Sequence, residues 1–125
     1  MEDYDGSAKR HFSDAISLAE IKSFDNAGYL IGLAVECAIK KKCRLTRGDI
    51  DKGNGHLPGL THIAKLKIDS RRDTMLFNTL NRGVLKNWAI DARYAPTGNI
   101  NEDLYKTWFN EAKVIFRLTG IKKDK

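Results

Sequence analysis

The chain of 125 residues is long enough for one domain with a modest core, and its 42% hydrophobic and 30% charged residues exclude a wholly disordered protein. Its formal net charge of +6 favours anionic partners, nucleic acid above all, although many small basic proteins bind nothing anionic. The longest apolar run, residues 27–39, contains Glu36 and is shorter than the about 20 residues that cross a bilayer. The N-terminal residues lack the apolar stretch of a secretory signal. We therefore expect a cytoplasmic protein without membrane contact.

Helical periodicity dominates the first third of the chain. A first helix is predicted by apolar residues that recur on one face, at Ala8, Phe12, Ala15 and Ala19. Asp25 is suited to cap a second helix, and Phe24 with Tyr29 fits a hydrophobic staple around that cap. This second helix should run to about Cys43, because the basic residues 40–42 and Arg44 complement the negative end of its dipole.

The second helix is apolar on nearly all sides over residues 27–39, so neighbouring elements must cover it. Small residues within it allow other backbones to approach closely. Because a chain of this length offers few covering elements, we expect a homodimer. Its predicted interface contains Gly28, Tyr29, Gly32 and Leu33. Cys37 and Cys43 point away from each other on this helix, which predicts two reduced thiols.

Shorter elements are predicted in the middle of the chain. Residues 46–59 contain four glycines and a proline and should form a loop. A short third helix follows from Leu60. Ser70 with Asp73 resembles a capping box that opens a fourth helix, and Gly83 ends that helix.

The last helix is the most fully specified element. Asn101 caps it, acidic residues fill its first turn, and Gly120 follows its end. No segment shows the alternation of a strand. The sequence therefore predicts an all-α bundle of four to five helices that forms a single domain over residues 1–125, with residues 1–5 and 121–125 frayed.

Residues 24–41, FDNAGYLIGLAVECAIKK, resemble the second helix of small stand-alone prokaryotic HEPN domains, which has the form AxYLxxxAVExAxK. Residues 10–20 are similar to the first helix of that family. The pair Gly55-His56 is similar to its central loop, and Arg93-Tyr94 to its Arg-Tyr-x-Pro segment. The resemblance implies an up-and-down bundle of four or five helices that usually dimerises. It also implies a role in toxin–antitoxin pairs, phage defence or RNA cleavage, beside an antitoxin or a small nucleotidyltransferase.

Ribonuclease members of that family carry an arginine followed by a histidine after four to six residues. No histidine follows Arg93 at that spacing, and none follows the other arginines. Metal-independent RNA cleavage needs groups that exchange protons and a cation near the phosphorane, which histidine and arginine supply. We therefore expect a non-catalytic or divergent HEPN-like module that acts by binding protein or RNA. The alternatives are a ribonuclease with an unusual active site and a helical partner subunit of a nucleotidyltransferase.

Four residues outside the basic cluster are the main candidates for a functional site. Glu36 either faces a groove beside Arg93 or forms an ordinary helical pair with Lys40. Arg93 and Tyr94 either contact a phosphate or a partner, or fix the end of a loop. His56 is the first candidate for a catalytic histidine, although a loop histidine is more often a local hydrogen-bonding group.

A basic cluster follows at the end of the second helix. Lys40 and Lys41 either bind phosphate or form a solvated helix end. The histidines have no neighbouring residues at zinc-ligand spacing, so we expect neither a metal nor another cofactor.

Overall fold

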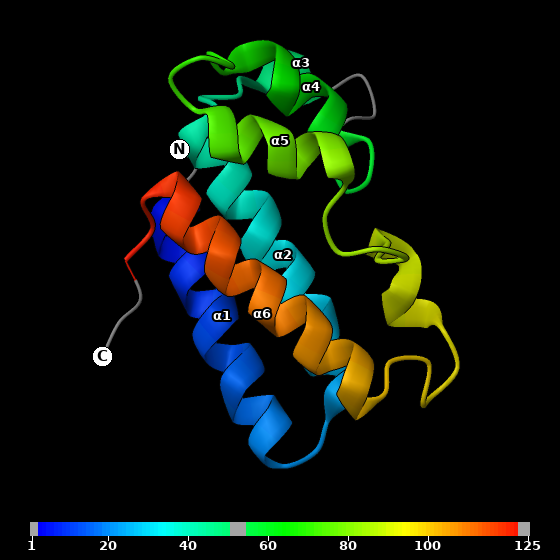
Figure 1. Cartoon of the computed structure of the whole chain (residues 1–125). Coiled ribbons are helices and arrows are strands. Elements are labelled where there is room, and N and C mark those ends of the chain that lie inside the picture. Colours follow the sequence, from blue (N-terminus) through cyan, green and yellow to red (C-terminus); the bar gives the residue numbers. More distant parts are fainter. Residues whose placement is uncertain (1–2, 51–54, 123–125) are drawn as a thin grey trace.

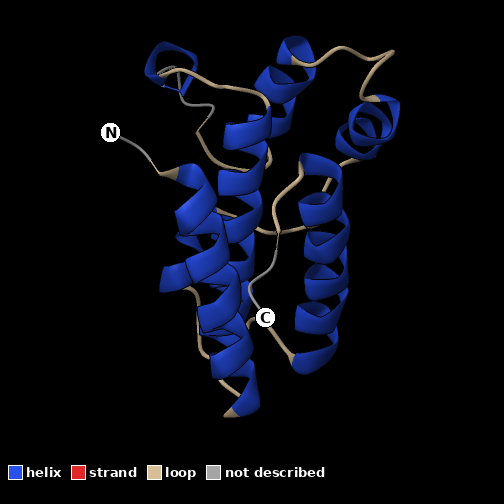
Figure 2. Ribbon diagram, turned by 90° about the vertical axis from the view of Figure 1, so that its left-hand side faces the viewer, coloured by secondary structure: helices blue, strands red, loops and turns tan. Residues whose placement is uncertain are grey.

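The computed structural model describes residues 3–50 and 55–122 and contains no strand within them. The elements are α1 (Tyr4–Glu20), α2 (Phe24–Lys42), α3 (Arg47–Ile50), α4 (Leu60–Lys67), α5 (Thr74–Arg82), the 3-10 helix η1 (Ile90–Tyr94) and α6 (Glu102–Thr119). Figures 1 and 2 show the three long helices α1, α2 and α6 side by side, with α4 and α5 at one end of them. The all-α prediction is confirmed.

Helix α2 is the central element of the core. Its buried residues face several directions, as expected for a helix that is apolar on most sides: Ala27, Gly28, Ile31, Gly32, Ala34, Val35, Glu36, Ala38 and Ile39. Helix α1 packs along one side through Ala8 and Phe12, and α6 packs along another through Ile115 and Phe116.

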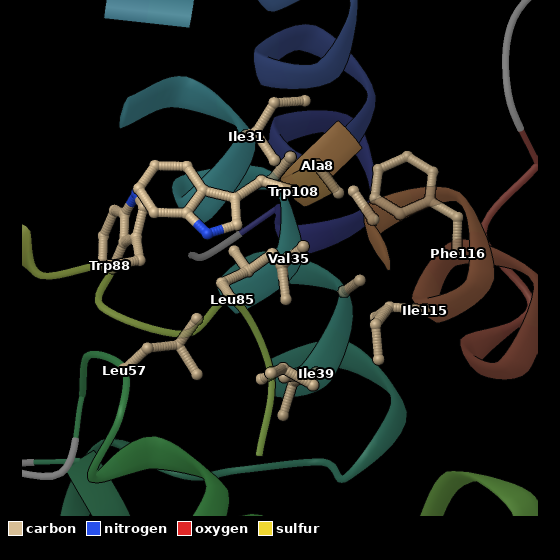
Figure 3. Close-up of a cluster of buried hydrophobic side chains, with 14 of the residues drawn as sticks. Ala8, Ile31, Val35, Ile39, Leu57, Leu85, Trp88, Trp108, Ile115 and Phe116 are labelled. Atoms are coloured by element: carbon tan, nitrogen blue, oxygen red, sulfur yellow. The ribbon is translucent and has the colours of Figure 1, made fainter. Parts of the chain in front are cut away.

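Loop residues complete the cover of α2. Figure 3 shows Leu57, Leu85 and Trp88, which come from loops, in the same cluster as Val35 and Ile39 of α2. Trp88 is buried, and its Nε1–H donates a hydrogen bond of 3.1 Å to the backbone oxygen of Gly28. The chain itself therefore supplies much of the cover for which we expected a second subunit.

The cap predicted at Asp25 is wrong. Helix α2 begins at Phe24, after Ser23, and no side chain caps it. The carboxylate of Asp25 instead accepts the backbone N–H groups of Gly98 and Ile100, each at 2.8 Å. The carboxylate that was expected to cap the helix is therefore used in two long-range hydrogen bonds. These bonds fix the segment before α6 against α2.

The predicted capping box at Ser70 is also wrong. Helix α5 begins at Thr74, after Asp73, without a side-chain cap, although it does end before Gly83 as expected. Asp69 is the acid that stabilises the preceding turn, because its carboxylate accepts the backbone N–H groups of Arg71 and Arg72.

The loop predicted at residues 46–59 contains a helix, α3. Thr46 and Asp49 stabilise its start, since the Asp49 carboxylate accepts the Thr46 N–H at 2.8 Å and the Thr46 hydroxyl accepts the Asp49 N–H at 3.2 Å. The glycines of this segment had suggested a structure without regular elements. Residues 51–54 of the predicted loop lie outside the described residues.

The cap, the acidic first turn and the terminating glycine predicted for the last helix are all confirmed. The Asn101 side chain accepts the N–H of Leu104 at 2.8 Å, and Gly120 adopts the left-handed conformation at the C-cap with φ of 77°. At the two ends of the described chain, Asp3 caps α1 and Ile121 is buried, while the fraying expected of residues 1–5 and 121–125 stays a prediction. Residues 1–2 and 123–125 lie outside the described residues.

Candidate functional site

Glu36 is the one charged residue that is buried within the described chain. Only 2% of it is exposed, yet both of its carboxylate oxygens have partners. Oε1 lies 3.0 Å from Nδ1 of His56, and Oε2 accepts the backbone N–H of Leu57 at 2.8 Å. A buried carboxylate in such a place is tolerated because hydrogen bonds replace its lost water.

The local sequence explains why this contact forms. Glu36 is one turn beyond Gly32 on α2, on a side of the helix that α1 and α6 leave to the loops. Leu57 is an apolar anchor at 3% exposure, and it holds the end of the loop, just before α4, against that side. His56 is the residue before Leu57, so the burial of Leu57 also places His56 beside the Glu36 carboxylate.

Burial and hydrogen bonding act on the Glu36 carboxyl in opposite directions. Removal of water raises its pKa above the ordinary value of 4.5, while the contacts with His56 and with the N–H of Leu57 lower it, as does the charge of Lys40. The effect of burial is the largest, so the net direction of the pKa is upward. Glu36 consequently takes up a proton more readily than a surface glutamate does.

His56 connects this buried acid to the surface. Half of its side chain is exposed, whereas the side chain of Glu36 is 2% exposed. A carboxylate on Nδ1 orients an imidazole and fixes which of its nitrogens carries the proton. Nε2 is then the ring nitrogen with which His56 can bind a ligand or exchange a proton.

The remaining candidates for the site lie in two other places, η1 and the end of α2. Arg93 belongs to η1, but its side chain lies outside what the structure describes, so its predicted pairing with Glu36 stays a prediction. Tyr94 is 78% exposed. Lys40 lies over the ring of Tyr4, with Nζ 5.8 Å from the ring centre.

The basic cluster at the end of α2 is engaged within the chain. Lys41 pairs with Asp5 at 2.9 Å, and Lys42 pairs with Asp73 at 3.4 Å. These acids reduce the positive potential that the sequence suggested at this helix end. Less positive charge is therefore available at Lys40 and Lys41 for a phosphate than the number of basic residues in this cluster suggested.

The four predicted interface residues divide into two pairs. Gly28 and Gly32 are buried, and a Cβ at Gly32 would collide with the indole of Trp88. Their small size therefore serves packing inside one chain. Tyr29 and Leu33 are half-buried, and Tyr29 stacks on Trp88 with ring centres 5.9 Å apart. Tyr29 and Leu33 are thus the two predicted interface residues with surface left for a partner.

Sequence reasoning missed the contact between Glu36 and His56. It paired the acid with Lys40 at the helical spacing or with Arg93, and it treated His56 separately. A signal was present, because one acid inside an apolar helical stretch requires hydrogen-bond donors, and a Gly-His pair in a following loop can provide them.

No described cluster of three or more histidines, cysteines or acids is arranged to hold a metal ion. The described helices include none with the length and apolar character needed to span a bilayer. Comparison with family models, with curated proteins and with solved structures found no match to this chain.

Proposed function

We propose that the chain is a HEPN-like helical module that acts by binding protein or RNA, in a toxin–antitoxin or phage-defence type of system. The burial of Glu36 is the observation that carries the proposal. Glu36, for which one alternative was a groove beside Arg93, is 2% exposed, and its two oxygens contact His56 and Leu57. It therefore holds a loop against α2 and offers no carboxylate to activate a 2′-hydroxyl. The missing Arg-His spacing supports the same conclusion.

The proposed module is a homodimer that uses the outer side of α2. Tyr29 and Leu33 supply half-buried apolar surface there, and a second copy would complete its burial. Light scattering tests this proposal. Leu33→Arg should convert the dimer to a monomer, whereas Ile16→Arg, a matched change on exposed surface of α1, should leave the dimer intact. A monomeric wild-type protein would contradict the proposal.

A metal-independent ribonuclease is the second candidate, and the pair of Glu36 and His56 favours it. A half-exposed histidine whose Nδ1 contacts a buried carboxylate has the arrangement of a general base. Such an enzyme would use Nε2 of His56 to take the 2′-hydroxyl proton and a nearby cation to stabilise the phosphorane.

One experiment separates the two candidates. Purified protein is incubated with total RNA, with and without EDTA, and both the integrity of the RNA and its retention by the protein are measured. The binding module should leave the RNA intact in both conditions. Retained RNA should be released by salt, because phosphate contacts displace counterions. A module that binds only protein would retain no RNA but would still form the α2 dimer.

Cleavage that persists in EDTA would favour the ribonuclease. In that case His56→Asn should abolish cleavage, because asparagine can still donate to Glu36 but cannot exchange a proton. His11→Asn, at a half-buried histidine of α1, is the matched control and should keep full activity. Loss of cleavage in both variants would rule out His56 as the specific base.

A further inference from the structure

A groove with a volume of about 470 Å³ lies along α4 and reaches α5. It is lined by His62, Ile63, Lys65, Leu66 and Phe77. Leu66 is 80% exposed, and Met75, in the first turn of α5, is 68% exposed. Large apolar side chains that are exposed next to a concave surface are typical of a binding site for another macromolecule.

The groove lies in a positively charged part of the chain. Residues 60–82 contain five lysines and arginines against two aspartates, and one of the five, Lys67, pairs with Asp49 at 3.2 Å. Both aspartates are engaged, since Asp69 accepts two backbone N–H groups and Asp73 pairs with Lys42. Lys65 lines the groove itself, and its Nζ is 3.2 Å from the side-chain oxygen of Asn81. The potential at this surface is therefore suited to a negatively charged occupant.

We propose that this groove binds an acidic amphipathic helix of a partner protein. Apolar side chains on one face of such a helix would enter between Ile63, Leu66 and Phe77. Its glutamates and aspartates would lie near Lys65, and the exposed Arg71 and Arg72 of the α4–α5 turn add positive charge to the same segment. This is the helix-in-groove mode, in which apolar residues about one helical turn apart anchor the ligand.

Other occupants fit the groove less well. A second copy of this chain would bring a second positively charged surface, and like charges oppose that contact. A bilayer is flat and does not enter a concave surface. RNA bases stack on exposed aromatic faces, whereas the most exposed apolar lining residue is the aliphatic Leu66.

This inference rests on the proposed function only where that function includes binding a protein, and it names the chemistry of that partner. The groove residues are separate from Tyr29, Leu33 and His56. The dimer and RNA measurements therefore stand whether or not the groove binds a helix.

The test uses the full chain and a fluorescein-labelled synthetic helix of about five turns. The probe has leucines at i, i+3, i+4 and i+7 and glutamates elsewhere, and a second probe replaces every glutamate by lysine. Fluorescence anisotropy should show saturable binding of the acidic probe and none of the basic probe. Amide shifts in NMR spectra should change at residues 62–66 and 75–77.

Two variants with matched controls locate the binding. Leu66→Glu should weaken binding at least about tenfold, because an apolar contact is lost and a repulsive charge is added. Ile21→Glu, at another exposed apolar residue (73%), should not weaken it. Lys65→Glu should also weaken binding, whereas Lys106→Glu on α6, exposed at 64%, should not. Circular dichroism confirms that each variant is folded.

Three results would overturn the proposal. The first is no saturable binding of the acidic probe, or equal binding of both probes. The second is binding that Leu66→Glu and Lys65→Glu leave unchanged. The third is Leu66-dependent binding to vesicles of phosphatidylglycerol and phosphatidylcholine in place of the peptide, which would identify the surface as a membrane contact.

Discussion

Replacement of Gly32 by alanine tests how closely the loop residue Trp88 packs on α2. A Cβ at this position would collide with three atoms of the indole, namely Cε2, Nε1 and Cζ2. The obstacle is a rigid ring system with 3% exposure, and its Nε1 is held by the backbone oxygen of Gly28. The indole must therefore shift or leave its site.

The size of the stability loss depends on whether the indole shifts within its site or leaves it. A shift within the site costs about 1–3 kcal/mol as overpacking, and expulsion of a buried tryptophan costs about 3–5 kcal/mol. Alanine returns about 1 kcal/mol, because it forms helix more readily than glycine. The clash involves the body of the ring, so we expect the free energy of unfolding to fall by about 2–4 kcal/mol.

Urea unfolding, followed by circular dichroism and tryptophan fluorescence, measures this loss. Gly48→Ala is the matched control, because a Cβ there meets only the Thr46 hydroxyl at an ordinary 3.7 Å. It should leave stability unchanged or slightly higher. The double variant Gly32→Ala, Trp88→Leu should lose less than the sum of the single variants, since the smaller side chain relieves the clash. A Gly32→Ala protein as stable as Gly48→Ala, or strictly additive losses, would refute the reasoning.

Three further predictions concern polar and titratable groups. Because the pKa of Glu36 is raised in the folded chain, its contribution to stability is most favourable below its ordinary pKa of 4.5 and declines as the pH rises through the folded pKa. Glu36→Gln should remove this decline in urea titrations at several pH values, and an unchanged slope would contradict the assignment. Asp25→Ala should lower stability by about 1–3 kcal/mol and speed hydrogen exchange of the two amides that its carboxylate accepts, whereas fully retained protection would argue against these bonds. Burial and the charge of Asp73 raise the pKa of the Cys43 thiol to about 11, so mass spectrometry should find iodoacetamide on Cys37 first; early labelling of Cys43 would show an open core.

The sequence was most informative where local chemistry decides the structure. Asn101 and Gly120 define α6 through contacts within a few residues, and both behave as expected. The apolar residues of α1 define that helix in the same way. Helix formation is a short-range event, so periodicity and capping residues suffice for elements of this kind.

Prediction failed where a side chain is engaged far along the chain. Asp25 suits a helix cap, yet its carboxylate binds amides 73 and 75 residues away. Gly28 and Gly32 suggested a second subunit, although Ile100 packs against Gly28 and Trp88 packs against Gly32 within the chain. A sequence pattern shows that a helix surface must be buried. Which residue buries it depends on the path that the loops take in the folded chain.

The candidate site illustrates the same division. The sequence identified Glu36 and His56 separately, from an acid in an apolar stretch and from a glycine-rich loop. Their contact joins residues 20 positions apart, and the burial of Leu57 brings them together. No local spacing rule contains that information. The contact forms because a buried carboxylate needs hydrogen-bond donors, and the fold brings His56 and Leu57 to it.

The central position of α2 also has a consequence for synthesis of the chain. The ribosome releases α1 and α2 well before α6 and the Trp88 loop, so Ile31, Val35 and Ile39 remain without their later partners for the time needed to translate the second half. A nascent chain in this state exposes an apolar helical face, which favours aggregation or binding by a chaperone. That face can be buried only after residue 116 has been translated. A ribosome that stalls earlier would therefore hold an incomplete pair of helices, α1 and α2, that is prone to aggregation.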